Sequence, residues 1–75
     1  MENTKVYIEV DFYGNITKIF STDFEQPSFN SILIDEGQGE KYRHAQTQYL
    51  SKPLVDRKGE YNYQYIGGTI IDRGI

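Results

Sequence analysis

The same seven-residue pattern occurs twice in this 75-residue chain, and it constrains the fold more than any other feature. Residues 10–16 and 55–61 both read apolar residue, aspartate, two variable residues, glycine, polar residue, apolar residue. An aspartate at the first corner of a turn accepts hydrogen bonds from the backbone N–H groups ahead of it. A glycine three residues later adopts the positive φ that closes a type I turn into a bulged hairpin. The sequence therefore predicts a β-hairpin near each end of the chain.

Length and composition describe one small domain, residues 1–75, with a thin core. A chain of this length buries only about 60% of the surface that its unfolded state exposes. The absence of cysteine excludes a disulfide, a thiolate metal site and a thiol nucleophile. Leucine is scarce and seven tyrosines supply much of the apolar bulk; tyrosine suits half-buried cores and interfaces equally. We therefore expect added stability from association, as a homo-oligomer or within a larger assembly.

The charge distribution argues against nucleic-acid and membrane partners. The formal net charge is −3, and the lysines and arginines are spread along the chain, with no block that would neutralise phosphates. No apolar run approaches the roughly 20 residues of a membrane-spanning helix. Residues 1–5 lack the basic and apolar segments of a secretory signal, so we expect synthesis and folding in a cytoplasm.

Alternation of apolar and polar residues predicts the strands. Segment 5–11 has its β-branched residues on one face, whereas segment 16–22 carries apolar residues on both faces and leaves its inward face open. The loop that follows is expected to be anchored by Phe24 and Phe29. Further strands are predicted at 31–35, 53–56, 60–66 and 69–73, the last two joined by a two-residue turn at Gly67-Gly68.

One helix is predicted, over residues 40–50. Tyr42, Ala45 and Tyr49 recur at helical spacing and form an apolar stripe, and Pro53 stops the helix because the residue before a proline leaves the helical region. The order β-β-β-α-β-β-β predicts an α+β fold in which an antiparallel sheet of hairpins carries the helix on one face. The predicted core residues are Val6, Ile8, Val10, Ile32, Ile34, Tyr42, Ala45, Tyr49, Tyr63 and Ile70.

The sequence offers little catalytic chemistry. His44 is the only histidine, and Glu40 at i−4 can orient its ring, but no nucleophile accompanies the pair. The acidic stretch 35–40 does not follow the ligand spacing of a calcium loop, and its Gly-x-Gly lacks the third glycine of a dinucleotide-binding motif. We therefore expect a protein that is not an enzyme and has no catalytic residues, metal site or cofactor.

The tyrosines are the candidate binding residues. One interpretation is that the ladder of Tyr61, Tyr63 and Tyr65 packs on the helix stripe inside the subunit. The other is that these rings line a recognition surface together with Tyr7 on the outer sheet face and Tyr13 in a turn, since tyrosine is enriched in binding hot spots. In the second interpretation, the contact surface is the sheet face that the helix leaves uncovered.

The run of residues 34–46, Ile-Asp-Glu-Gly-Gln-Gly-Glu-Lys-Tyr-Arg-His-Ala-Gln, is followed by Tyr49. It resembles small proteins encoded by bacteriophages and prophages of low-GC Gram-positive bacteria. The flanking Ile-Thr-Lys-Ile-Phe-Ser-Thr-Asp-Phe and Pro-Leu-Val-Asp segments agree with that resemblance. Such proteins occur among tail and host-recognition genes, so the resemblance implies a tail-associated or accessory role and association with the virion. It assigns no catalytic residues.

Two functions follow from these observations as hypotheses. The first is a non-enzymatic phage or prophage structural module that binds a protein partner, such as a tail or baseplate component, through an aromatic sheet face. The alternative is a small carbohydrate-binding module whose exposed tyrosines stack on sugar rings.

Overall fold

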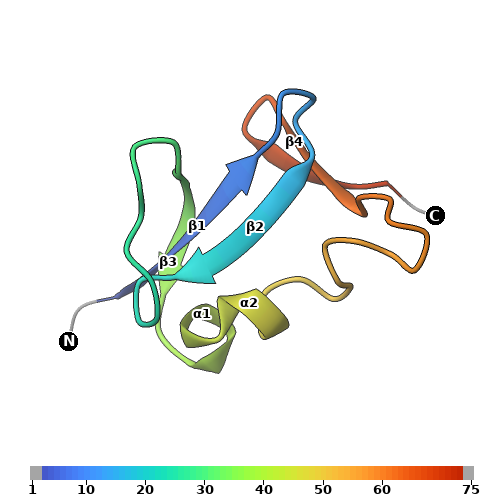
Figure 1. Ribbon diagram of the computed structural model, residues 1–75. Helices are drawn as coiled ribbons and strands as arrows, with labels where there is room; N and C mark the ends of the chain where they lie inside the picture. The colour runs from blue at the N-terminus through green and yellow to red at the C-terminus, as the bar shows by residue number, and fades with distance from the viewer. Residues whose placement is uncertain (1–2, 74–75) are drawn as a thin grey trace.

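The computed structural model describes residues 3–73 and has an α+β fold with two antiparallel sheets and two short helices (Figure 1). In chain order the elements are β1 (Thr4–Val10), β2 (Ile16–Ser21), β3 (Ile32–Gly37), α1 (Glu40–Arg43), α2 (Ala45–Gln48), β4 (Tyr63–Ile66) and β5 (Thr69–Asp72). The first sheet has the order β2-β1-β3, and β4 pairs with β5 in a separate hairpin. The predicted fold class is confirmed, with the order β-β-β-α-α-β-β.

Both predicted aspartate–glycine turns form with the same hydrogen bonds. Asp11 Oδ1 accepts the backbone N–H groups of Tyr13 and Asn15, each at 2.9 Å. Asp56 Oδ1 accepts N–H groups two and four residues ahead, at 2.8 and 2.9 Å. The glycines have φ values of +86° and +83°, and each donates its N–H to the carbonyl of its aspartate at 3.1 Å. The repeated sequence pattern thus encodes one turn geometry, used twice.

The strand predicted at 53–56 is reduced to a single bridge between Val55 and Tyr61. Pro53 has no N–H to donate to a ladder. Its carbonyl accepts the side-chain amide of Asn62 at 2.7 Å, a bond to a side chain in place of a strand bond. Regular pairing therefore begins only at β4, which starts at residue 63 and not at the predicted residue 60.

The single helix predicted over 40–50 is two four-residue helices, separated at His44. In a continuous helix the Arg43 carbonyl would accept the N–H of Thr47. It accepts the buried hydroxyl of Ser21 on β2 instead, at 2.6 Å, and Thr47 N–H bonds to the His44 carbonyl at 3.0 Å. A tertiary hydrogen bond from the sheet therefore accompanies the break in the helix.

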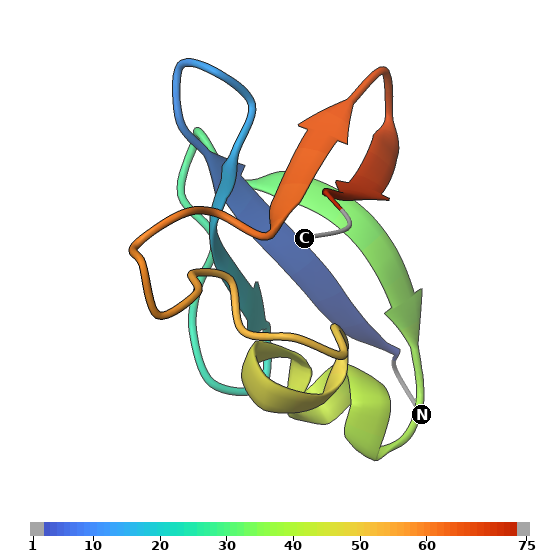
Figure 2. The same cartoon turned by 90° about the vertical axis from the view of Figure 1, so that its right-hand side faces the viewer.

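The core lies between the three-stranded sheet, the helices and the β4–β5 hairpin (Figures 1 and 2). All ten predicted core residues are confirmed, because each is buried in this cluster or packs against it. The prediction omitted further members of the cluster, namely Ile16, Ile19, Leu50, Leu54 and Tyr65.

The opposite sheet face, predicted to lie uncovered, is covered in part by the chain itself, although Leu33 on that face stays 47% exposed. Because β3 lies beyond β1 from β2, segment 22–31 must cross β1, and it does so on the side away from the helices (Figures 1 and 2). Phe20 points to this side and is 0% exposed. Its ring stacks on Tyr7 at 5.9 Å and lies under the Lys18 ammonium, which forms an ion pair with Glu25 of the crossing segment.

Gly37 lies against the ring of Tyr42, and this contact predicts a large effect of a small substitution. A methyl group at Gly37 would lie 2.6 Å from Cε2 and Cζ of that ring, which forces the ring to move. Gly37→Ala is therefore expected to lower the free energy of unfolding by about 1–3 kcal/mol, measured by urea denaturation. The same substitution in a Tyr42→Ala background should have a much smaller effect. Equal effects in both backgrounds would show that the ring contact is not the cause.

Candidate interaction surface

The two corner residues of the first turn are the most exposed aromatic pair of the β1–β2 hairpin. Phe12 is 96% exposed and Tyr13 is 77% exposed. Their rings meet edge to face, with centroids 5.6 Å apart and planes at 87°. The hydrogen bonds of the turn involve the Asp11 carboxylate and backbone groups, not these two rings. We call Phe12 and Tyr13 the aromatic tip.

The second turn has the same backbone geometry without aromatic residues at its corners. Its corner positions hold Arg57 and Lys58, both exposed, and its aspartate and glycine make the same hydrogen bonds as those of the first turn. A type I turn accepts most residues at these corners. The aromatic residues of the first turn are therefore not required by the turn geometry.

The base of the aromatic tip is held by β4. Tyr65 donates its backbone N–H to the Gly14 carbonyl at 2.8 Å, and Asn15 forms a β-bridge with Gln64. Asn15 also donates its side-chain amide to Asp11 at 3.0 Å. That bond, with support from backbone N–H groups, holds the pKa of the Asp11 carboxyl below its usual value of 3.8. The tip thus projects from a well-bonded base that carries a negative charge at neutral pH.

The five predicted binding tyrosines do not share one surface. Tyr13 is exposed at the tip, whereas Tyr7 is half-buried against Phe20 on the sheet face away from the helices. Tyr63 is 4% exposed within the core on the helix side, and its hydroxyl accepts the Lys52 N–H at 3.2 Å. The remaining members, Tyr61 and Tyr65, are half-buried.

Sequence reasoning missed Phe12. The signal was present in the repeated turn, because its two variable corners are aromatic in one copy and charged in the other. The expectation that Phe29 anchors its loop is also wrong, since that ring is 102% exposed. Phe24 is only partly anchored: its ring lies 5.3 Å from that of His44 but stays largely exposed.

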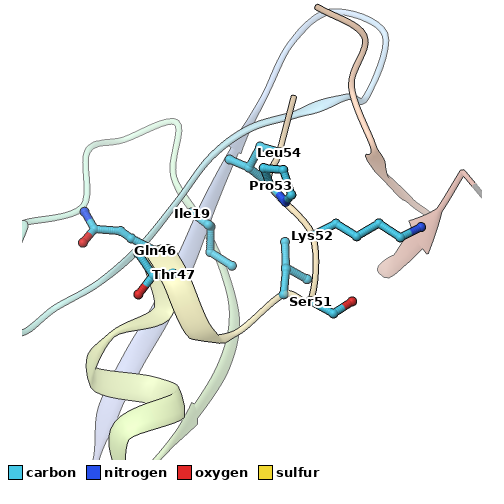
Figure 3. Close-up of a pocket in the computed structure, with 8 residues that line it drawn as sticks. Ile19, Gln46, Thr47, Ser51, Lys52, Pro53 and Leu54 are labelled. Carbon is cyan, nitrogen blue, oxygen red and sulfur yellow. The ribbon is translucent and has the colours of Figure 1, made fainter. Parts of the chain in front are cut away.

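A pocket of about 320 Å³ lies between α2, β2 and the segment that follows α2 (Figure 3). Ile19 rises from β2 in its middle, and Thr47 lies at its α2 side. Aliphatic and polar side chains share the lining: Ile19, Leu50, Pro53 and Leu54 with Gln46, Thr47, Ser51 and Lys52. The Lys52 ammonium also lies 3.0 Å from Asp72.

His44 makes contacts that link the α1–α2 junction to the crossing segment. Its Nε2 lies 2.9 Å from Glu40 Oε2, as the helical spacing predicted, and its ring contacts that of Phe24. Within residues 3–73, no group of three or more His, Cys, Asp or Glu side chains is placed to hold a metal ion.

Tyr49 is half-buried and packs against the core. Its hydroxyl donates to Asp35 Oδ2 at 2.9 Å. Burial, reinforced by the hydrogen bond and charge of Asp35, raises the pKa of Tyr49 to about 12. Because the pKa is higher in the folded state than the ordinary value of 10.0, the stabilisation is complete below pH 10 and is lost as the pH rises towards 12.

Alkaline titration tests this contact. We expect one tyrosine to ionise near pH 12 in ultraviolet difference spectra, with the free energy of unfolding falling over the same interval. Tyr49→Phe should remove both the late ionisation and that part of the pH dependence. An unchanged titration in Tyr49→Phe would assign the shifted group elsewhere.

Comparisons with protein-family models, curated proteins and solved structures found no match to this chain. Among the helices that the structure describes, none is long and apolar enough to cross a membrane.

Proposed function

We propose that this chain is a non-enzymatic interaction module that binds a protein partner through the aromatic tip. The observation that carries the proposal is the pair of equivalent turns, one with Phe12 and Tyr13 at its corners and the other with Arg57 and Lys58. The turn geometry does not require exposed aromatic rings at these corners, because the second turn has charged residues there. Such aromatic residues are of the kind that dominate binding hot spots.

The geometry of the tip also favours binding. Full burial of a phenylalanine side chain stabilises a complex by about 1.5–3 kcal/mol. The Gly14 carbonyl is bonded to β4 at 2.8 Å, so little backbone freedom remains to be lost on association, which lowers the entropic cost. The tip therefore acts as a preorganised knob suited to an apolar recess in a partner.

The resemblance of residues 34–46 to phage and prophage proteins supports a more specific proposal. In this proposal the module is made in the cytoplasm, belongs to a tail or baseplate assembly and is carried in the virion. The tip then holds the module to another component of that assembly.

Site-specific photo-crosslinking tests the proposed function. A photoreactive phenylalanine analogue replaces Phe12 in cells that contain the native partners, and the matched control places the same analogue at Arg57. We expect a discrete cross-linked protein from position 12 and none from position 57. No product from position 12, or the same products from both positions, would contradict the proposal.

A second candidate function, carbohydrate binding, is favoured by the exposure of the Tyr13 ring. A sugar stacks on a flat aromatic face, and the Tyr13 ring offers such a surface beside the Phe12 ring, which stands at 87° to it. A glycan array distinguishes the two functions: carbohydrate binding requires a signal that Tyr13→Ala abolishes, whereas protein binding requires none.

A further inference from the structure

We propose that Phe29 is a second contact point, so that one partner surface takes up both the aromatic tip and the Phe29 ring. This inference rests on the proposed function and adds the kind of partner, a protein surface with two apolar recesses and basic side chains between them. It is carried by two exposed aromatic turns that are fixed to the same end of β1.

Phe29 occupies a corner of a hydrogen-bonded turn in the crossing segment, residues 28–31, which we call the serine turn. Ser31 donates its backbone N–H to the Ser28 carbonyl at 3.1 Å, and Ser28 donates its own N–H to Ser31 Oγ at 3.0 Å. These bonds close a four-residue turn with Phe29 and Asn30 at its corners. The Phe29 ring is 102% exposed, so it is held in place by the turn without being part of the core.

β1 holds the serine turn beside the aromatic tip. The Ser31 hydroxyl donates to Glu9 Oε2 at 3.4 Å, and Asp11, two residues further along the chain, fixes the tip. Two residues of an extended strand span about 7 Å, so the anchors of the two turns are neighbours. Figures 1 and 2 both show the two turns at the end of the molecule away from the helices. One partner surface can therefore contact both turns at once.

The anchors of the two turns carry negative charge that no ion pair neutralises. The hydrogen-bond partners of Asp11 are neutral, namely the Asn15 amide and backbone N–H groups. Within residues 3–73, neither Glu9 nor Asp11 belongs to an ion pair. Lys18 lies opposite Glu9 in the ladder but forms its ion pair with Glu25. Basic side chains on a partner complement this charge.

Two fixed contact points on one molecule strengthen binding to a single partner. Once the aromatic tip has bound, contact at Phe29 requires little further loss of translational and rotational freedom. The backbone of each turn is already ordered by its hydrogen bonds, so little loop ordering is needed on binding. The two points therefore act together on one partner.

Photo-crosslinking compares the two contact points. The photoreactive phenylalanine analogue replaces Phe29 in the same cells, and the matched control replaces Phe24, an exposed phenylalanine of the same segment whose ring lies beside His44. We expect position 29 to capture the protein that position 12 captures, and position 24 to capture none. A different protein or none from position 29, or the same protein from position 24, would overturn this inference.

Alanine variants measure the contribution of the second point. Phe29→Ala should retain the fold, because the ring is fully exposed, and should weaken affinity for the cross-linked partner at least about tenfold. Phe24→Ala should leave that affinity unchanged. Unchanged affinity in Phe29→Ala with weakened affinity in Phe12→Ala would overturn this inference and leave the proposed function intact. Unchanged affinity in both Phe29→Ala and Phe12→Ala would contradict the proposed function itself.

Association kinetics test the basic surface of the partner. Glu9→Gln removes a charge but keeps an oxygen that can accept the Ser31 hydroxyl, and the matched control is Glu60→Gln in the second turn, which is also exposed. We expect Glu9→Gln to lower the association rate constant about two- to fivefold at low salt, and the difference to disappear at high salt. Glu60→Gln should leave the rate constant unchanged. Association of Glu9→Gln at an equal or higher rate would overturn the proposed chemistry of the partner.

Discussion

Replacing Phe20 by alanine is expected to lower the free energy of unfolding by about 3–5 kcal/mol, as for other fully buried aromatic residues. The side chain is 0% exposed; its ring stacks on Tyr7 and lies under the Lys18 ammonium, which pairs with Glu25 of the crossing segment. A domain of this size has a total stability on the order of 4–11 kcal/mol. The variant should therefore be partly or wholly unfolded at physiological temperature, as measured by urea denaturation followed by circular dichroism.

The matched control is Phe29→Ala, which removes the same kind of ring from a fully exposed position in the crossing segment. It should change the free energy of unfolding by no more than about 0.5 kcal/mol. If Phe20→Ala were equally mild, the far face of the sheet would not be a second packed layer.

A second variant is expected to have a large effect on binding and almost none on the free energy of unfolding. Transferring the corner residues of the second turn to the first, as Phe12→Arg with Tyr13→Lys, should leave the free energy of unfolding within about 0.5 kcal/mol. It should weaken binding at least about 30-fold, the effect of losing one strong hot spot. The physical reason is that the Asp11 and Gly14 bonds that form the turn are untouched, whereas both aromatic contacts are lost.

The reciprocal transfer, Arg57→Phe with Lys58→Tyr, is the control for nonspecific stickiness. Added to the first transfer, it restores the aromatic composition at a different place, so binding should remain lost. Recovery of binding in the combined variant would show that aromatic surface in general, and not the position of the tip, determines the contact. Affinity is measured with the cross-linked partner.

The features that sequence predicted well are local ones. The two turns need only an aspartate, a glycine and the backbone between them, and the Gly67-Gly68 turn needs two residues with positive φ, which they have at 60° and 83°. The hydrogen bonds of these turns join residues no more than four positions apart. Such features are written in short stretches of sequence and do not depend on the rest of the chain.

The features that sequence could not show depend on distant contacts. The helix break at His44 coincides with a bond from Ser21, 22 residues away from its acceptor. The strand order β2-β1-β3 explains why β2 has apolar residues on both faces. In this order the crossing segment passes over the face of the sheet that carries Phe20. Strand order is a property of the whole sheet, so alternation within one strand could not predict it.

The candidate site was predicted in part. Tyr13 was identified from its place in a turn. The role of the tyrosine ladder in binding was overestimated, because Tyr63 is buried where the β4–β5 hairpin packs on the core. The pocket was not predicted at all, since its lining comes from β2, α2 and the segment after α2. Only the fold brings these three parts together.

The central claim is that the rings of the aromatic tip are free in the isolated domain and buried on association. Fluorotyrosine placed at Tyr13 tests it by fluorine NMR with a soluble paramagnetic agent. We predict strong relaxation of the signal in dilute protein and protection from the agent in the complex with the cross-linked partner. Protection already in the dilute monomer, or continued access in the complex, would contradict the account.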